Sequence, residues 1–234
     1  MNLVNTRMRP QPSAVPQHKT APHSLGFNLG AIMLMIAMLV LSVAWAFDTL
    51  VRHQRHGPAP LGAEEATLKR TLVGRDLEIP ISWFRYAEQK QDGFATQVDL
   101  ELMLPLGKDG ALKPIDVTLI PQSQARPSAS LLDGVYLHQF MPNELSGPPG
   151  LVGKPLYGTE GYEGETVWYD ALSSNPFVTK CVAPVDGHGS SRCLRTVALT
   201  AGIAAVYAFD SDVLPAWQSF DPEMQKWLHQ IGAI

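Results

Sequence analysis

The segment Val98 to Leu104, VDLELML, decides the fold class of this 234-residue chain. Its aliphatic side chains alternate with two carboxylates and a methionine, which is the period-two pattern of a half-buried β-strand. A second alternating run, Ile115 to Ile120, follows after the turn residues Gly107 to Gly110. Two such runs joined by a short turn predict an antiparallel pair of strands.

The same reasoning extends the predicted sheet in both directions along the chain. Pro80 within the first further run indicates an edge strand or a bulge, because proline has no amide hydrogen to donate to a neighbouring strand. Ala201 and Gly202 separate the last two runs and predict a hairpin. The further strand candidates are Leu77 to Ile81, Val135 to Phe140, Glu165 to Asp170, Phe177 to Val182, Leu194 to Leu199 and Ala204 to Phe209.

The chain ends in a segment with helical spacing. Asp221 is suited to cap this helix, and Pro222 is suited to its first position. Met224, Trp227, Leu228 and Ile231 then form one apolar stripe. The fold class predicted from these patterns is α+β: one N-terminal transmembrane helix, then a mostly antiparallel β-rich domain closed by a C-terminal helix.

The transmembrane helix is predicted from Leu29 to Phe47, LGAIMLMIAMLVLSVAWAF, which contains no charged residue. Three interpretations compete for this run. A permanent signal anchor is favoured by the absence of acidic residues before Asp48 and by Trp45 near the far end. Cleavage after Ala46 would fit the small residues of Ala44-Trp45-Ala46. A buried core helix is disfavoured because the run is long and lacks a polar face.

Four regions follow from this assignment. Residues 1–24 are rich in proline and polar residues and are expected to be a disordered tail. Residues 25–50 form the anchor, and residues 51–75 form a juxtamembrane spacer with a short helix from Glu64 to Leu72. Residues 76–234 form the extracytoplasmic β-rich domain. We expect the lipid bilayer to be a partner through residues 25–50.

Charge and cysteine content narrow the function classes. The chain has 18 Lys and Arg and 22 Asp and Glu; residues 1–56 hold five of the former and one of the latter, which leaves 13 and 21 for the rest. An acidic domain lacks the basic surface that nucleic acids require, so no nucleic acid is expected as a partner. Cys181 and Cys193 are too few for a zinc site and are predicted to form a structural disulfide in an oxidising compartment.

One acidic and aromatic cluster is a candidate ligand site. Three interpretations are open: a calcium loop, a glycan-binding surface with aromatic stacking, and a solvated acidic loop, which is the preferred one. The candidate residues are Glu160, Glu163, Glu165, Trp168 and Asp170.

Two tryptophans near the C-terminus, Trp217 and Trp227, are candidate contacts for a partner protein, although the plainer interpretation is that they cover the sheet. Asp186 to Ser191 brings Asp, His and Ser together, but in an order that fits no known nucleophile motif. No catalytic residue, metal site or cofactor is predicted.

Several short motifs resemble a group of uncharacterised single-pass inner-membrane proteins of Gram-negative bacteria. They are Leu77-Glu-Ile-Pro80, Trp83-Phe84-Arg85, Val98 to Pro105, Gly150-Leu151, Cys181 with Cys193-Leu-Arg195, Tyr207-Ala-Phe209 and Leu214-Pro-Ala-Trp217. The resemblance covers about residues 25–230 and implies a bacterial inner-membrane protein with a cytoplasmic N-terminus and a periplasmic domain. It brings no known activity or ligand.

The expected function is therefore a membrane-anchored extracytoplasmic interaction or accessory module that contacts a membrane or envelope protein. The alternative is an envelope enzyme or binding protein that acts on a glycan or peptide through the Glu160 to Asp170 region.

Overall fold

The computed structural model describes residues 32–45, 58–158, 164–184 and 187–234. Two compact units are distinguished, residues 1–55 and 56–234. In the first, residues 32–45 are helical, and large apolar side chains such as Leu34, Leu39 and Leu41 are exposed. Within the described residues, no helix has both the length and the apolar character needed to cross a bilayer.

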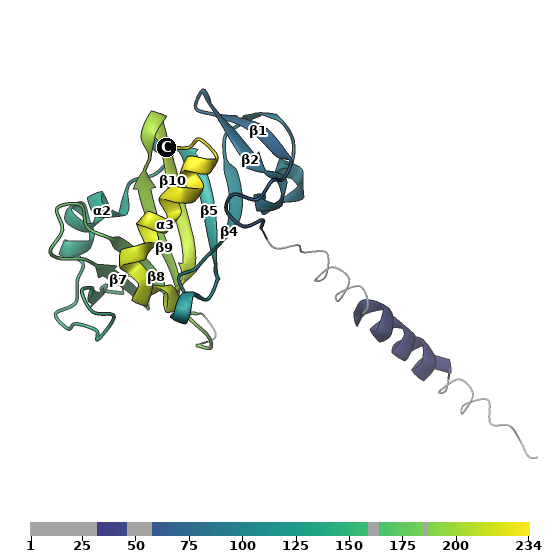
Figure 1. Cartoon of the computed structure of the whole chain (residues 1–234). Coiled ribbons are helices and arrows are strands. Elements are labelled where there is room, and N and C mark those ends of the chain that lie inside the picture. Colours follow the sequence, from purple (N-terminus) through teal and green to yellow (C-terminus); the bar gives the residue numbers. More distant parts are fainter. Residues whose placement is uncertain (1–31, 46–57, 159–163, 185–186) are drawn as a thin grey trace, which may run out of the picture. The chain divides into compact units, whose positions relative to one another are not determined.

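The second unit contains two sheets, and it confirms the α+β class with a C-terminal helix (Figure 1). The smaller sheet has the order β2-β1-β3, in which β1 is antiparallel to β2 and parallel to β3. Its strands are β1 (Thr67–Leu72), β2 (Arg75–Pro80) and β3 (Gly93–Ala95). As expected from Pro80, β2 is an edge strand.

The larger sheet has seven antiparallel strands in the order β4-β5-β10-β9-β8-β7-β6. Its second half is a meander from β6 to β10, and the β4–β5 hairpin then pairs with β10. The strands are β4 (Val98–Leu104), β5 (Lys113–Pro121), β6 (Val152–Pro155), β7 (Glu165–Tyr169), β8 (Val178–Val182), β9 (Arg192–Ala198) and β10 (Ile203–Asp210).

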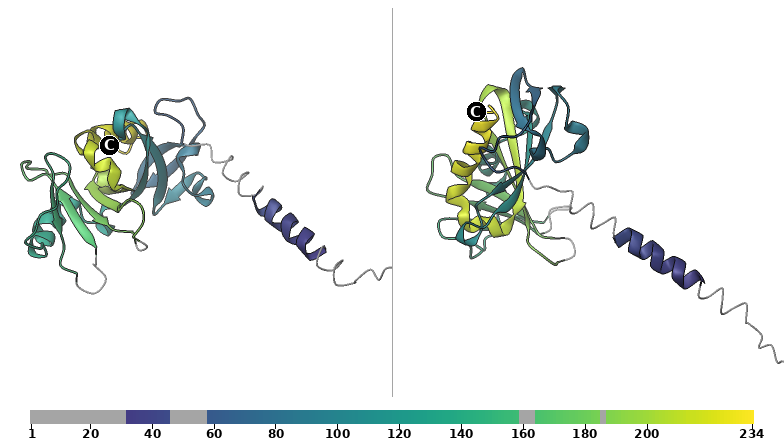
Figure 2. Two further views of the ribbon diagram at one scale, coloured as in Figure 1. Left: turned by 90° about the horizontal axis from the view of Figure 1, so that it is seen from below. Right: turned by 45° about the vertical axis from the view of Figure 1, so that its right-hand side comes forward.

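Two helices cover parts of the larger sheet. Helix α3 (Trp217–Gln230) lies against the face of β9 and β10, where its apolar stripe completes the main core (Figure 2). Helix α2 (Ser128–Gly134) contributes Leu132 to a second, smaller core on the opposite face, with Val167 and Val178 of β7 and β8. The sheet is thus covered on different faces at its centre and at its β6–β8 end.

The helix predicted from Glu64 to Leu72 is wrong, because Thr67–Leu72 form strand β1 of the folded unit and the three residues before it have no regular structure. Leu68 and Leu72 lie four apart, which suggested a helix, but Arg70 between them is also buried. Val73 and Gly74 both have positive φ and form the hairpin turn to β2, so Gly74 ends no helix.

Two other predictions also need correction. Val135 to Phe140 is not a strand: it continues from α2 into a short 3-10 helix, Tyr136–His138, and Tyr136 and Phe140 pack four residues apart on the second core. Helix α3 begins at Trp217, so Asp221 is inside it and does not cap it. Pro222 has no amide hydrogen, so the helix loses one hydrogen bond there. The loss is tolerated because it falls near the start of the helix.

Gly153 tests the packing at the β6–β7 edge of the sheet. A Cβ atom at this position would overlap the Trp168 ring, whereas a Cβ at Gly134 would meet nothing. We expect Gly153→Ala to lower the free energy of unfolding by about 1–3 kcal/mol through overpacking. The matched variant Gly134→Ala should change it by less than about 0.5 kcal/mol. Urea unfolding of both variants measures the difference, and equal values would show that the Trp168 ring moves aside freely.

Candidate functional site

The larger sheet opens between β8 and β9. Only three residue pairs join the two strands, from Val182–Arg192 to Lys180–Leu194. Beyond them, Thr179 Oγ1 still donates to the carbonyl oxygen of Leu194 at 2.9 Å, but backbone pairing has ended. The second half of β9, from Arg195 onward, is therefore paired on one side alone. We call this opening the β8–β9 gap.

The predicted disulfide lies where the gap begins. Cys181 and Cys193 face each other across β8 and β9, are bonded, and are almost completely buried. Closing a loop of this length stabilises the folded state by roughly 2–3 kcal/mol in the chain-entropy model. The disulfide therefore joins the two strands at the middle of their three residue pairs, one pair before the gap opens.

Successive residues of β9 direct their backbone N–H and C=O groups alternately toward β10 and toward the gap. The Leu199 amide donates to Ile203 of the β10 side at 2.8 Å, whereas the Thr196 amide donates to Ser128 Oγ at 2.9 Å. Because strand residues alternate in direction, the carbonyl of Thr196 and both backbone groups of Ala198 also face away from β10. Within the described residues, these three groups have no backbone partner.

Arg195 connects the elements around the gap. It is 4% exposed, and its guanidinium donates to both carboxylate oxygens of Asp221 on α3, at 3.1 and 2.5 Å. It also donates to the Val178 carbonyl at 3.1 Å and lies over the Phe177 ring, 4.4 Å from its centre. One side chain of β9 thus contacts both α3 and the start of β8.

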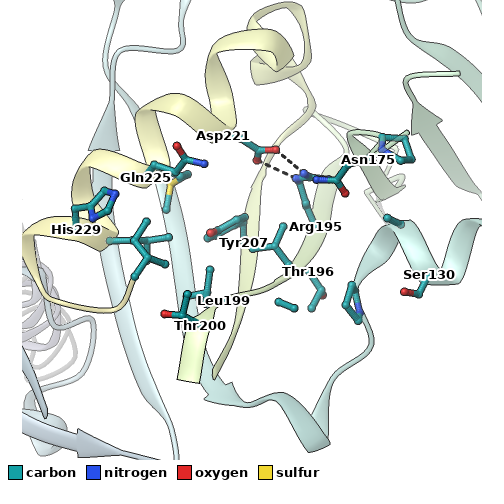
Figure 3. Close-up of a pocket in the computed structure, with 18 residues that line it drawn as sticks. Ser130, Asn175, Arg195, Thr196, Leu199, Thr200, Tyr207, Asp221, Gln225 and His229 are labelled. Carbon is teal, nitrogen blue, oxygen red and sulfur yellow. Dashed lines mark hydrogen bonds and ion pairs between the residues drawn. The ribbon is translucent and has the colours of Figure 1, made fainter. Parts of the chain in front are cut away.

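A cavity of about 810 Å³ lies beside the open half of β9. In Figure 3, Gln225 and His229 of α3 lie on one side of it and Ser130 of α2 lies on the other. Its charged side chains are Arg195 and Asp221, which neutralise each other. The apolar lining residues are Pro127, Ala129, Pro176, Val197, Ala198, Leu199, Met224, Leu228 and Ile234.

Tyr207 places a polar atom in this cavity. The residue is 2% exposed, and its hydroxyl forms no hydrogen bond within the described part of the chain but keeps contact with the open space of the cavity. Burial raises the pKa of the Tyr207 hydroxyl well above its ordinary value, and the nearby Asp221 carboxylate raises it further. At neutral pH the hydroxyl is therefore a neutral donor and acceptor, suited to binding rather than to proton abstraction.

The acidic candidates on β7 do not converge. Glu165 is buried and pairs with Lys180 at 2.7 Å, on the face covered by α2. Trp168 projects from the opposite face, because residues of odd and even number alternate along a strand. Asp170 accepts the Leu172 amide at 3.0 Å in its own turn. Glu160 and Glu163 lie outside the described residues.

Trp168 does line a second cavity, of about 560 Å³. Its neighbours there are mostly prolines and small residues, among them Gly147, Pro148, Pro149 and Pro215. No carboxylate side chain lines this cavity in the part of the chain that the structure describes. The arrangement of Glu165, Trp168 and Asp170 therefore does not provide paired acids around one pocket.

The two C-terminal tryptophans pack inside the domain. Trp227 is 4% exposed and lies against Trp83, with 4.5 Å between ring centres. Trp217 is half-buried, and its indole N–H donates to the Pro149 carbonyl at 3.1 Å. Both side chains are used to hold α3 against the sheet, and Trp217 alone retains partial exposure.

Sequence reasoning missed the residues that build this cavity. Arg195 lies between Cys193 and Val197 on the inward face of β9, and a charged residue in an inward position is a readable signal of a buried ion pair. Tyr207 and Asp221 gave no comparable signal, because their proximity depends on how α3 crosses the sheet. Across the described residues, no group of three or more His, Cys, Asp or Glu could hold a metal ion.

No family model matches the chain, and neither does any curated protein. Two solved structures are similar. An immunity protein of the Stenotrophomonas maltophilia type IV secretion system is 11% identical, with a TM-score of 0.49 over 71% of this chain and 93% of that protein. The iron-regulated outer membrane lipoprotein FrpD of Neisseria meningitidis is 12% identical, with a TM-score of 0.45 over 74% of this chain and 97% of its own.

The buried Tyr207 hydroxyl predicts a specific pH dependence of stability. Because its pKa is raised in the folded state, the unfolded chain loses this proton first as the pH rises. Stability that is present below pH 10 should therefore fall above it, by about 1 kcal/mol between pH 10 and 11. Urea unfolding across pH 8–11 measures this loss. In Tyr207→Phe that part of the slope should vanish, and an identical slope in both proteins would contradict the assignment.

Proposed function

We propose that this chain is a membrane-anchored extracytoplasmic binding module, which acts as an interaction or accessory protein for a membrane or envelope partner. The observation that carries the proposal is the cavity beside β9. Its two charged side chains neutralise each other, and the Tyr207 hydroxyl faces it without a hydrogen-bond partner among the described residues. Such a lining is suited to holding an uncharged ligand rather than to acid–base chemistry.

The anchor is supported by the apolar run Leu29 to Phe47. The helical residues 32–45 within it expose apolar side chains, and such a surface is stable in hydrocarbon rather than in water. With the bilayer as a partner through residues 25–50, the domain would be held at the membrane surface. The resemblance to single-pass inner-membrane proteins supports the bacterial inner membrane as the location.

The disulfide supports an extracytoplasmic position for the domain. Structural disulfides persist in oxidising compartments and are rare where thiols are kept reduced. The bond between Cys181 and Cys193 is buried and joins two paired strands, as expected of a structural disulfide. A cytoplasmic N-terminus and a periplasmic domain follow for a single-pass anchor.

The alternative is an envelope enzyme or binding protein for a glycan or peptide through the Glu160 to Asp170 region. Its described members give it little support, because Glu165 and Trp168 project from opposite faces of β7. Asp170 is engaged in its own turn. We therefore prefer binding at the β9 cavity.

The anchor and the orientation are tested together by expressing the full chain in a Gram-negative host. We expect the protein to stay in the membrane pellet after carbonate extraction, and its N-terminus to lie before residue 29. Cys181 and Cys193 should resist alkylation until a reductant is added under denaturing conditions. A soluble product that begins at Phe47 would show cleavage, and alkylation without reductant would place the domain in a reducing compartment.

The binding role is tested by purifying the tagged full chain from native membranes in mild detergent. We expect one membrane or envelope protein to co-purify in a fixed ratio. The variant Ser130→Trp should release it, because the larger side chain projects toward the cavity. The matched variant Ser174→Trp, on an exposed loop outside this lining, should retain the partner. A chain that purifies alone in every case would count against an accessory role.

A further inference from the structure

We propose that the β8–β9 gap binds an extended, uncharged polypeptide segment of a partner protein, which adds to β9 as a strand and places an apolar side chain in the cavity beside α3. This inference rests on the proposed binding function and specifies the chemistry of the partner.

The open half of β9 has backbone groups that a strand could pair with. Three groups at Thr196 and Ala198 face the gap without a backbone partner among the described residues. A polypeptide strand presents its own N–H and C=O groups at the same spacing and can satisfy them, as in other cases of strand addition. The Thr196 amide is already bonded to Ser128, which limits the added strand to the end near Ala198.

The accessible part of this edge lies at Ala198. Folded proteins protect a free strand edge with proline, with charged side chains or with a covering helix. Helix α2 covers the start of the open half of β9, where Ser128 accepts the Thr196 amide. Ala198 beyond it is exposed, and the segment Thr196-Val-Ala-Leu199 contains neither proline nor a charged residue. An added strand can therefore pair at the end of β9 near Ala198.

The chemistry of the cavity favours an uncharged, apolar side chain. Its volume of about 810 Å³ accommodates several side-chain groups, and apolar residues supply much of its wall. Arg195 and Asp221 neutralise each other, so a charged side chain entering the cavity would lose hydration without gaining a free counter-ion. Because alternate residues of a strand face the same way, every second residue of the segment would face α3.

The Tyr207 hydroxyl is a polar group in the cavity to which a ligand can form a hydrogen bond. Tyr207 is 2% exposed and lines the cavity, and its hydroxyl forms no hydrogen bond within the described part of the chain. The hydroxyl keeps contact with the open space of the cavity, where a ligand that supplies a carbonyl or hydroxyl oxygen would accept a hydrogen bond from it. We therefore expect the segment to bond to Tyr207 with either a backbone carbonyl or a Ser or Thr side chain.

The test uses the full chain in lipid nanodiscs and a phage-displayed library of random dodecapeptides as the probe. We expect enriched peptides to be uncharged, with apolar residues at alternate positions, and to bind in fluorescence anisotropy as capped synthetic peptides. Ala198→Pro removes the edge amide and should weaken binding at least tenfold. Ala198→Val keeps the amide and should stay within threefold. Tyr207→Phe should weaken binding about three- to tenfold.

A second readout does not depend on variants of the protein. Peptides N-methylated at alternate residues lose the donors that pair with β9, so one methylation register should abolish binding to the unchanged chain and the other should not. Failure to enrich any peptide, or equal affinity for Ala198→Pro and for both methylation registers, would overturn strand addition. Dimers that Ala198→Pro dissociates would show a second copy as the occupant and would equally overturn a foreign segment.

These outcomes are separable from failure of the proposed function. Membrane extraction and partner co-purification report on the anchored binding module whether or not strand addition occurs. A chain that keeps its partner in Ala198→Pro but loses it in Ser130→Trp would retain the binding function and exclude the β9 edge as its mode.

Discussion

The contact of the buried Arg195 guanidinium with the partly exposed Asp221 carboxylate is the interaction on which the arrangement of this domain depends. Arg195 comes from β9, Asp221 from α3, and the same guanidinium also contacts β8 through the Val178 carbonyl. A buried guanidinium is unfavourable unless its donors are satisfied, so these elements must meet at one point. The contact joins α3 to β9, and the same guanidinium takes the Val178 carbonyl beyond the last backbone pair of β8 and β9.

The opening in the sheet follows from that constraint. Where Arg195 uses the Val178 carbonyl, the ladder between β8 and β9 ends, and the Cys181–Cys193 bond joins the strands one pair earlier. Helix α2 packs against both strands at the opening and accepts one amide of β9 through Ser128. The opening is therefore bordered by the Arg195 contacts on one side of the sheet and by α2 at the edge of β9.

Local patterns predicted the elements whose stability comes from one alternating face, such as β4, β5, β7 and β10. These local patterns failed where a charged residue bonds to a partner that is distant in the sequence. Arg70 takes an inward position on β1 between Leu68 and Leu72, so these two apolar residues lie four apart, which is also the spacing of a helix face. Asp221 had the chemistry of a cap but serves Arg195 instead. The cavity was not predictable because Tyr207 and Asp221 meet only through the crossing of α3 over β10.

A short strand edge and a membrane anchor would suit each other energetically. Hydrogen bonds contribute about 0.5–1.5 kcal/mol each, and one buried apolar side chain contributes about 1.5–3 kcal/mol. Against the cost of association, three backbone groups and one pocket correspond to modest affinity, which a free peptide can still show in solution. If the proposed anchor holds both chains in one membrane, their confinement raises the effective concentration toward the millimolar range and increases the occupancy of such a contact. The open end of β9 would then favour a partner on the same membrane surface.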